Sequence, residues 1–311
     1  MSAMNVEHLG TPVRPMTRVP GKASNRVYRL DTDQGSFAVK ELDVDRGWEY
    51  RFDDVFRLEM AAFEAGIAMP EPISASATVV VHRWVQGEQL TEGPVSKAFA
   101  FDVGAILATL HSLDVDWPDA PAAEPEPTDW AGLADQAAAT GQPWAEELAR
   151  NVETFEAIAE FVEASEPPGP VVLTHRDVQP WNLLNRAGHP VVLDWEISGR
   201  MEVSSELAST ALGLAKGSSF EDVDAAVLRS VLDGYVDGGG SLPPASPDWF
   251  AYMLGGWLDF TRRNIVRCVS GRESPTGVEL EFCHDEARNG LRGLPDMFRQ
   301  LPRLGNLLTA G

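Results

Sequence analysis

Cysteine and lysine are both scarce in this chain of 311 residues: there are two cysteines and only four lysines. Two cysteines cannot form a disulfide scaffold, so we expect Cys268 and Cys283 to be structural thiols rather than a bridge or a metal site. No apolar run approaches the ~18 residues that a membrane span needs. Residues 1–16 lack the apolar core of a signal peptide. We therefore expect a cytoplasmic protein with no membrane partner.

Positively charged residues are also few compared with negatively charged ones. Asp and Glu number 47 against 25 Lys and Arg, which gives a formal net charge of −22. A field of this sign repels nucleic acid and attracts cations. The excess could steer a cationic substrate towards the protein, or it could be a general solubility bias, because the acidic residues are spread along the chain. Both interpretations stay open, but the charge excludes nucleic acid as a partner.

The most informative stretch is residues 171–196. A short apolar segment leads into Asp177, and Asn182 follows five residues later. Two further apolar arms flank a turn at Arg186–Pro190, which predicts a β-hairpin, and the second arm ends on Asp194. Because a hairpin with matched arms brings its two ends together, we expect Asp177, Asn182 and Asp194 to converge on one small volume.

This grouping suits phosphoryl transfer from a nucleotide. The reaction needs a carboxylate that orients the attacking hydroxyl and accepts its proton, for which Asp177 is the candidate. It also needs hard oxygen ligands for Mg²⁺, and Asn182 and Asp194 are the candidates for these. The spacing from His175-Arg176-Asp177 to Asn182 matches the catalytic-loop pattern H-R-D-x-x-x-x-N.

The N-terminal part reads as a β-hairpin. An alternating run at residues 25–30 and a second at residues 36–42 are joined by a polar loop that contains Gly35. The turn before the first strand holds Ser24 and Asn25, which could bind phosphate through backbone N–H groups and side chains, or could simply belong to an ordinary hairpin. Lys40 lies inside the second strand, either facing water or facing a cleft as a phosphate ligand.

A helix is predicted over residues 48–66, followed by a strand over residues 79–85. Glu59 falls within the apolar stripe of the helix, where a carboxylate needs a partner. An ion pair with Lys40 would supply one and would hold that lysine against the phosphates. The alternative is a partly solvated glutamate at the edge of the stripe. The strand ends with Trp84-Val85 before a break at Gln86-Gly87.

The rest of the chain is predicted to be mostly helical. Apart from the hairpin stretch, helices are expected at about 97–113, 144–164, 203–216, 219–236, 246–271 and 276–300. The helix over 246–271 is rich in aromatic residues, and such stripes usually pack in a core. Trp257 and Asp259 on this helix could instead line a site for a cationic ligand.

These motifs make the chain similar to the superfamily of small-molecule kinases that contains the aminoglycoside phosphotransferases and choline kinases. The resemblance runs from about Gly21 to the last helix. It rests on Ser24–Arg29, Ala38–Lys40, Glu59, Leu107–His111, His175–Asn182 and Leu193–Glu196. It implies an α+β, bilobal, protein-kinase-like fold. Residues 1–86 would form an N-terminal lobe, an antiparallel sheet with one helix, and residues 87–311 a larger, mainly helical C-terminal lobe.

The resemblance also implies roles for individual residues. Asp177 would be the catalytic base, Asn182 and Asp194 the Mg²⁺ ligands, and the nucleotide ATP, with GTP as the alternative. The residues implied to bind the nucleotide are Ser24, Asn25, Lys40, Glu59, Trp84 and Val85, the last two through the backbone that contacts adenine.

Two positions depart from the pattern that these small-molecule kinases share. Arg176 stands where they commonly have glycine, and we expect it to pack or pair locally. Glu206 stands in place of an aspartate that braces the catalytic loop, and the extra methylene leaves open how the loop is held. Glu196 is assigned no chemistry.

We expect an ATP-dependent O-phosphotransferase that acts on a small, cationic hydroxylated molecule: an aminoglycoside, another basic antibiotic or an amino sugar. Choline, ethanolamine, homoserine and macrolides are the alternative acceptors. A catalytically silent kinase-like binding protein is the alternative of a different class, although all of the expected catalytic residues are present. A monomer and a homodimer both stay open, as do roles in antibiotic resistance, biosynthesis and metabolism.

Overall fold

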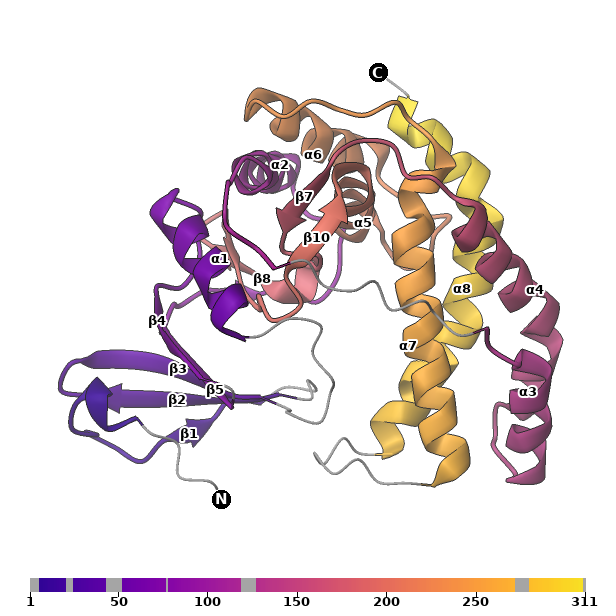
Figure 1. Ribbon diagram of the computed structural model, residues 1–311, viewed down its shortest axis with the longest axis horizontal. Coiled ribbons are helices and arrows are strands. Elements are labelled where there is room, and N and C mark those ends of the chain that lie inside the picture. Colours follow the sequence, from indigo (N-terminus) through magenta and orange to yellow (C-terminus); the bar gives the residue numbers. More distant parts are fainter. Residues whose placement is uncertain are drawn as a thin grey trace.

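The computed structural model describes residues 6–20, 25–42, 52–76, 78–118, 127–271 and 280–309. Within these ranges a small part dominated by one antiparallel sheet precedes a larger part built mainly from helices (Figure 1). The predicted α+β, bilobal, kinase-like architecture is therefore confirmed. Ser24, which we predicted to bind phosphate, lies outside the described residues.

The sheet of the small lobe has five antiparallel strands in the order β1-β2-β3-β5-β4. The strands are β1 (Thr17–Arg18), β2 (Arg26–Thr32), β3 (Gly35–Glu41), β4 (Pro72–Ala75) and β5 (Val79–Arg83). The 3-10 helix η1 (Glu7–Leu9) brings Leu9 into a small core with four sheet residues, among them Phe37 and Val39. Since side chains alternate along a strand, Lys40 lies on the opposite face of β3 from this core.

The helix of the small lobe, α1 (Phe52–Glu64), packs beside β4 and places its apolar positions towards the interior. Val55, Leu58 and Ala62 are buried at the spacing expected of an amphipathic helix. Glu59 is buried with them, at 3% exposure. The chain turns away from this helix at Gly66, whose φ of 86° suits glycine.

The connection between the lobes leaves the small sheet after β5. The next strand, β6 (Glu88–Gln89), belongs to a different sheet, in which it pairs with β8 (Leu183–Arg186), and β8 pairs with β9 (His189–Val192). A separate two-stranded sheet joins β7 (Val171–Thr174) to β10 (Gly199–Glu202). The division that we placed after residue 86 stays a prediction, and β6 is the first strand that pairs with the larger lobe.

Helices form most of the larger lobe, in the order α2 (Lys97–His111), α3 (Trp130–Ala139), α4 (Ala145–Ala164), α5 (Val203–Ala215), α6 (Ala225–Asp237), α7 (Ala251–Ser270) and α8 (Leu280–Thr309). The short 3-10 helices η3 (Pro180–Asn182) and η4 (Pro247–Phe250) complete it. All of the helices that we predicted are present, with shifted ends: α8 ends nine residues later than predicted, and α6 also differs. It starts six residues later than predicted, because the side chain of Asp224 caps it by accepting from the N–H groups of Ala226 and Val227.

Two glycines allow α2 and α6 to approach very closely. A Cβ added to Gly104 on α2 would lie 2.0 Å from the carbonyl oxygen of Val231, and one added to Gly234 on α6 would lie 2.0 Å from that of Phe101. The two backbones are therefore in direct contact at a point where no other residue fits. This contact fixes α2 and its last residue, His111, against α6.

The helix α7 lies on the side of the larger lobe nearer to the small sheet, with α8 and α4 beyond it (Figure 1). Its core face buries Leu254, Leu258 and Ile265. In the described part of the chain, no helix combines the length and the hydropathy needed to cross a membrane.

Candidate active site

The hairpin β8–β9 brings its two ends together as predicted. The N–H of Leu193 donates to the carbonyl oxygen of Asn182 at 2.8 Å, which extends the ladder by one pair beyond Leu183 and Val192. Asp194 follows with a left-handed φ of 70°, so the chain turns sharply as it leaves β9. Asn182 and Asp194 are thus anchored to the two neighbouring ends of one rigid hairpin.

Asp177 and Asn182 are in direct contact. Nδ2 of Asn182 donates to the carboxylate Oδ2 of Asp177 at 2.8 Å and to its backbone oxygen at 2.9 Å. With both donors of the amide directed to Asp177, the remaining polar atom of Asn182 is its carbonyl oxygen, a hard ligand of the kind that Mg²⁺ prefers. The contact holds the carboxylate of Asp177 in one orientation.

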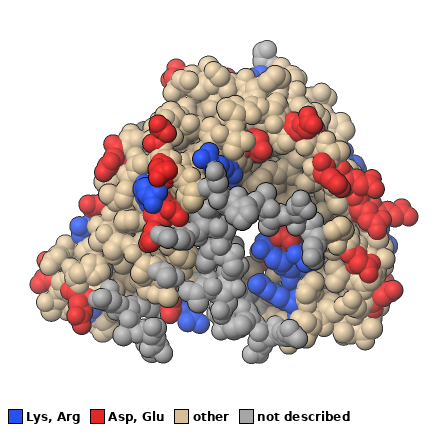
Figure 2. Space-filling view, viewed as in Figure 1, with Lys and Arg blue, Asp and Glu red and all other residues tan. Residues whose placement is uncertain are grey.

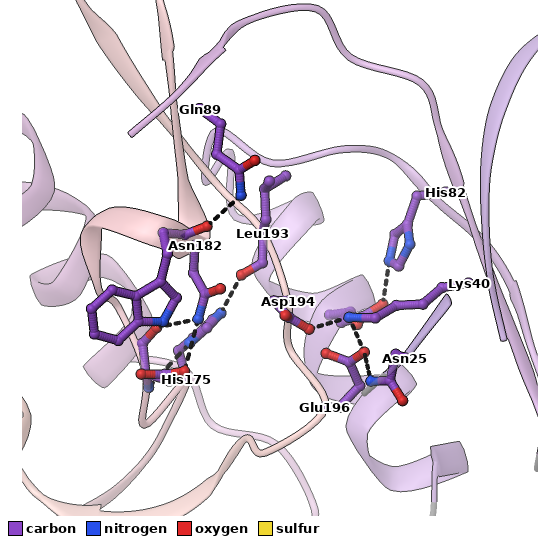
Figure 3. Close-up of polar contacts among 12 residues, drawn as sticks. Asn25, Lys40, His82, Gln89, His175, Asn182, Leu193, Asp194 and Glu196 are labelled. Carbon is purple, nitrogen blue, oxygen red and sulfur yellow. Dashed lines mark hydrogen bonds and ion pairs between the residues drawn. The ribbon is translucent and has the colours of Figure 1, made fainter. Parts of the chain in front are cut away.

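His175 ties the catalytic loop to the end of the hairpin (Figure 3). Its fully buried ring lies 2.8 Å from the carbonyl oxygen of Leu193 through Nε2, and the N–H of Asp177 donates to Nδ1 at 3.3 Å. These two contacts require the neutral tautomer with the proton on Nε2. Burial lowers the pKa of His175 from its usual value of 6.5, which favours the same uncharged form. The ring also packs edge-on against Trp195.

Glu206 braces the catalytic loop from α5. Its buried carboxylate accepts from the backbone N–H of Arg176 at 2.6 Å and from the hydroxyl of Thr174, and it lies 2.7 Å from Nε2 of His111. Arg176 needs this support because its backbone is left-handed, with φ of 69°. Nδ1 of His111 also lies 3.2 Å from the hydroxyl of Tyr235. The longer glutamate therefore keeps the bracing role of the aspartate that the resemblance implies.

The side chain of Arg176 extends to α7, in line with the local pairing that we expected. Its Nε donates to the hydroxyl of Tyr252 at 3.0 Å, and its guanidinium carbon lies 5.6 Å from the centre of that ring. The residue beside Asp177 is thus attached to the first turn of α7. This contact places α7 next to the catalytic loop.

Lys40 crosses from the small sheet to the segment after the hairpin. Its ammonium forms ion pairs with the carboxylates of Asp194 and Glu196, and Nδ2 of Asn25 donates to Glu196 at 3.1 Å (Figure 3). Four residues from two lobes therefore share one polar cluster. Lys40 therefore lies next to Asp194. A lysine that binds the phosphates of a nucleotide and an aspartate that binds its metal ion would need to be adjacent in this way.

The predicted ion pair between Lys40 and Glu59 is wrong. Glu59 lies 3.0 Å from Nε2 of His82, and its carboxylate is 4% exposed. His82 on β5 is the neighbour of Ala38 in the sheet and shares the face of Lys40, so it offers α1 a closer partner. Lys40 instead reaches past α1 to the two carboxylates beyond β9. Glu59 thus supports the sheet through His82 rather than through the lysine.

Trp84 and Val85 lie at the beginning of the connection between the lobes. The N–H of Trp84 donates to the carbonyl oxygen of Ser36 at 2.9 Å, so the first of the two still belongs to the edge of the sheet. Arg29 lies over the indole at 4.9 Å, and both residues are half-buried. Their place at the connection fits the predicted contact with adenine, which stays a prediction.

Trp257 and Asp259 do not form one site. The ring of Trp257 packs against Phe220 at 5.9 Å and fills the space beside Gly293 on α8. Asp259 is half-exposed and forms ion pairs with Arg262 and Arg263. The reason is helical geometry, because residues two apart point in different directions. The idea that both residues line a site for a cation is therefore wrong.

Three residues of this region were missed or given no role in the sequence. Glu196 has a detectable signal, since it is an acid two residues after Asp194 in the sequence. Tyr252 and His82 have none, because each reaches its partner only through the tertiary fold.

The comparisons with known proteins agree with this geometry. The sequence model of the phosphotransferase enzyme family matches residues 15–250, so the chain belongs to that family. It is a phosphotransferase with the kinase-like fold. A search of curated proteins found no match.

Several solved structures are similar over nearly their whole length. A spectinomycin phosphotransferase in complex with ADP and spectinomycin has a TM-score of 0.68 at 12% identity, covering 94% of both chains. An amicoumacin kinase with AMP-PNP, Ca²⁺ and its ligand has a TM-score of 0.58 at 14% identity, with 95% of both chains covered. A macrolide 2'-phosphotransferase from Brachybacterium faecium has a TM-score of 0.57 at 17% identity, covering 92% of this chain and 95% of the other. At these identities the likeness shows the fold alone.

Proposed function

We propose that the chain is a Mg²⁺-dependent kinase that transfers the γ-phosphate of ATP to a hydroxyl group of a small molecule. The observation that supports this most strongly is the contact of Asn182 with Asp177. Asn182 precedes the hairpin β8–β9, and Asp194, which follows the hairpin, is paired with Lys40. Groups suited to serve as a base, as two oxygen ligands and as a phosphate-binding cation are together in one small volume. This is the set of groups that phosphoryl transfer requires.

Asp177 acts as the general base in this proposal. Its carboxylate, oriented by Asn182, accepts a hydrogen bond from the acceptor hydroxyl and takes up the proton as the new O–P bond forms. The bond between the γ-phosphorus and the β,γ-bridging oxygen breaks, and ADP leaves with the bonding electron pair. The products are the phosphate ester of the acceptor and ADP, and the proton lost by the hydroxyl resides on Asp177.

The residues present fit a magnesium ion. In the described residues, no cluster of three or more His, Cys, Asp or Glu could hold a metal by protein alone. Mg²⁺ in nucleotide enzymes typically needs only one or two protein oxygens, with phosphates and water completing its shell. Asn182 and Asp194 would hold it, and when bound it neutralises charge on the phosphates.

Lys40 supplies the phosphate-binding cation from the other lobe. Its present partners, Asp194 and Glu196, keep the ammonium extended into the space between the lobes. Asn25 fixes Glu196 from the same side. Together with Ser24 and with the backbone of Trp84 and Val85, these residues form the proposed nucleotide site. ATP is the proposed donor, with GTP as the alternative.

The proposal leaves more than one class of acceptor open. The net charge of −22 supports an acceptor that carries a cationic group, such as an aminoglycoside, another basic antibiotic or an amino sugar. A spectinomycin phosphotransferase and an amicoumacin kinase have similar folds, which supports a role in antibiotic resistance as part of the proposal. Choline, ethanolamine, homoserine and macrolides are the alternative acceptors.

A coupled assay of ADP release tests the proposal. The purified chain is given ATP and Mg²⁺ with aminoglycosides, peptide antibiotics, macrolides, amino sugars and amino alcohols in turn. We expect release that depends on the acceptor, that needs Mg²⁺ and that is lost in Asp177→Asn. If no acceptor gives a signal and calorimetry detects no binding of Mg-ATP, the chain is a silent binding protein and the proposal fails.

A further inference from the structure

The helix α7 is basic in an otherwise acidic protein. It carries three arginines, Arg262, Arg263 and Arg267, against one aspartate, which leaves it a formal charge of +2 while the whole chain has −22. Figure 2 shows Lys and Arg side chains gathered over α7 in the hollow, with an acidic side chain among them, while other acidic side chains are scattered over this face. The formal charge of α7 is thus opposite in sign to that of the whole chain.

One carboxylate organises the basic surface. Asp259 accepts from Arg262 at 2.7 Å and from Arg263 at 3.2 Å, so two guanidinium groups are aligned side by side on one anion. The side chains of the two arginines are 37% and 46% exposed. Paired guanidinium groups with fixed orientation are suited to binding a carboxylate or a phosphate through several charge-assisted hydrogen bonds.

The same helix begins at the catalytic loop. The hydroxyl of Tyr252 accepts from Arg176, the residue next to Asp177. Tyr252, Gly256, Asp259 and Arg263 follow one another at intervals of three or four residues, so they lie on one face of α7. A helix rises ~1.5 Å per residue, so the two arginines lie about 15 to 17 Å along α7 from Tyr252.

Open space lies along this face. A Cβ added to Gly256 would meet no atom within 4 Å, and the residue is exposed. A molecule whose hydroxyl reaches Asp177 could therefore lie along α7 over Gly256 towards the two arginines. The face has a reactive end, an open middle and a cationic end.

We propose that the acceptor carries an anionic group, a carboxylate or a phosphate, which Arg262 and Arg263 bind about 15 to 17 Å along α7 from the end of the helix that contacts the catalytic loop. This rests on the proposed function, and it favours elongated hydroxylated acids over the purely cationic acceptors named there, such as aminoglycosides. An acceptor that also has an amine would be a zwitterion, which agrees with the acidic exterior. The competing explanation is that the three charged residues only stabilise α7 as i,i+3 and i,i+4 pairs, which contribute little at an exposed position.

Matched pairs of acceptors separate these explanations. Each member of a panel of hydroxylated acids, including peptides that end in a free carboxylate, is assayed beside its methyl ester. Sugar phosphates are assayed beside the parent sugars, so that a carboxylate and a phosphate are told apart. We expect the anionic member to have the higher kcat/KM by about tenfold or more, chiefly through KM.

The double variant Arg262→Gln with Arg263→Gln should remove the preference while the ester reacts as before, and replacement of both by lysine should restore part of it. Arg299→Gln is the matched control, since Arg299 on α8 forms the same i,i+3 pair with Asp296 and is 67% exposed. The inference is overturned if esters or cationic aminoglycosides react as well as the anionic acceptors or better. It is also overturned if the double variant keeps the preference for the anionic acceptor. Either outcome leaves the kinase function intact.

A binding measurement covers the case in which no member of the panel reacts. The dicarboxylate glutarate is titrated onto the protein saturated with Mg²⁺ and AMP-PNP. Binding to the wild type that is lost in the double variant supports the anionic site, whereas no binding, or equal binding to both, refutes it. Failure to bind Mg-AMP-PNP at all contradicts the proposed function itself, and the inference falls with it.

Discussion

The amide of Asn182 holds Asp177 at two points, donating to its carboxylate at 2.8 Å and to its backbone oxygen at 2.9 Å. This one side chain therefore fixes the orientation of the proposed base and presents its own carbonyl oxygen towards the proposed metal site. The proposed base and the proposed metal ligand are thus parts of one rigid unit, so neither can be displaced without the other.

Substitution of the base is the first prediction. In Asp177→Asn the side chain keeps its size but can no longer accept the proton of the hydroxyl, so kcat should fall by about 10²- to 10⁴-fold. Affinity for Mg-ATP should change little, because Asp177 faces the acceptor. ADP release and calorimetry measure the two quantities. Asp233→Asn, at an exposed position of α6, is the control, and an Asp177→Asn variant with normal kcat would rule out the assigned role.

The brace at Glu206 gives a prediction about stability. Glu206→Ala removes the acceptor shared by Thr174, His111 and the N–H of Arg176, all of which are left without it in a buried place. Each orphaned group costs about 1–3 kcal/mol, so the free energy of unfolding should fall by about 3 kcal/mol or more. Urea denaturation measures it. Glu202→Ala, at the N-cap of the same helix without a side-chain capping bond, should cost less than about 1 kcal/mol.

The pH dependence of stability should carry the signature of His175. Burial lowers the pKa of this histidine in the folded protein below its value in the unfolded chain. Below the unfolded pKa of about 6.5 the unfolded chain therefore binds more protons, and stability falls as the pH falls. The contribution is fully present above that pH.

Urea denaturation at a series of pH values measures this effect. His175→Gln keeps a donor for the carbonyl oxygen of Leu193 but cannot titrate, so its stability should fall less steeply between pH 7 and 5 than that of the wild type. Parallel curves for the two proteins would show that other groups cause the loss.

The two thiols should be inert in the folded protein. Cys268 and Cys283 are both buried and unpaired to each other, which confirms the prediction that they do not form a bridge. Burial raises the pKa of Cys268 to about 12 and raises that of Cys283 as well, so the thiolate that reacts with alkylating agents is scarce at neutral pH. Iodoacetamide at pH 8 should modify neither thiol until guanidinium chloride is added, as mass spectrometry would show. Rapid labelling of the native protein would contradict their burial.

Local sequence signals were enough to predict the catalytic loop and the hairpin. The spacing of Asp177, Asn182 and Asp194 between apolar arms fixes their relative position through strand pairing alone, and the structure brings them together accordingly. The partners of Lys40 were not predictable in this way. They depend on how the two lobes pack, and the nearest carboxylates come from residues more than 150 positions away along the chain. Glu59 looked like the partner only because it was the one acid in its stripe.

The separation of Trp257 and Asp259 on different faces of α7 could have been predicted from the sequence. A separation of two residues turns the side chains of a helix to different faces, so a shared site was geometrically excluded once the segment was assigned as helical. The position of the basic helix α7 was harder to foresee, because the net charge of the chain is −22 and only the fold shows which helix faces the catalytic loop.

The contact between α2 and α6 leads to the last prediction. In Gly104→Ala the new methyl would lie 2.0 Å from the carbonyl oxygen of Val231, so the two helices must move apart at their closest point. Overpacking of this kind costs about 1–3 kcal/mol, and it should outweigh the gain of about 1 kcal/mol from replacing glycine within a helix.

Gly256→Ala is the matched control, because an added Cβ there meets nothing within 4 Å in the middle of α7. That variant should gain stability by up to about 1 kcal/mol in urea denaturation, since only the helix propensity changes. A Gly104→Ala protein as stable as Gly256→Ala would mean that α2 and α6 are not in backbone contact. Because α2 ends at His111, which contacts Glu206, separation of these helices should also loosen the brace of the catalytic loop. Gly104→Ala should therefore also reduce kcat, although the residue lies far from the acceptor, whereas Gly256→Ala serves as the control for stability alone.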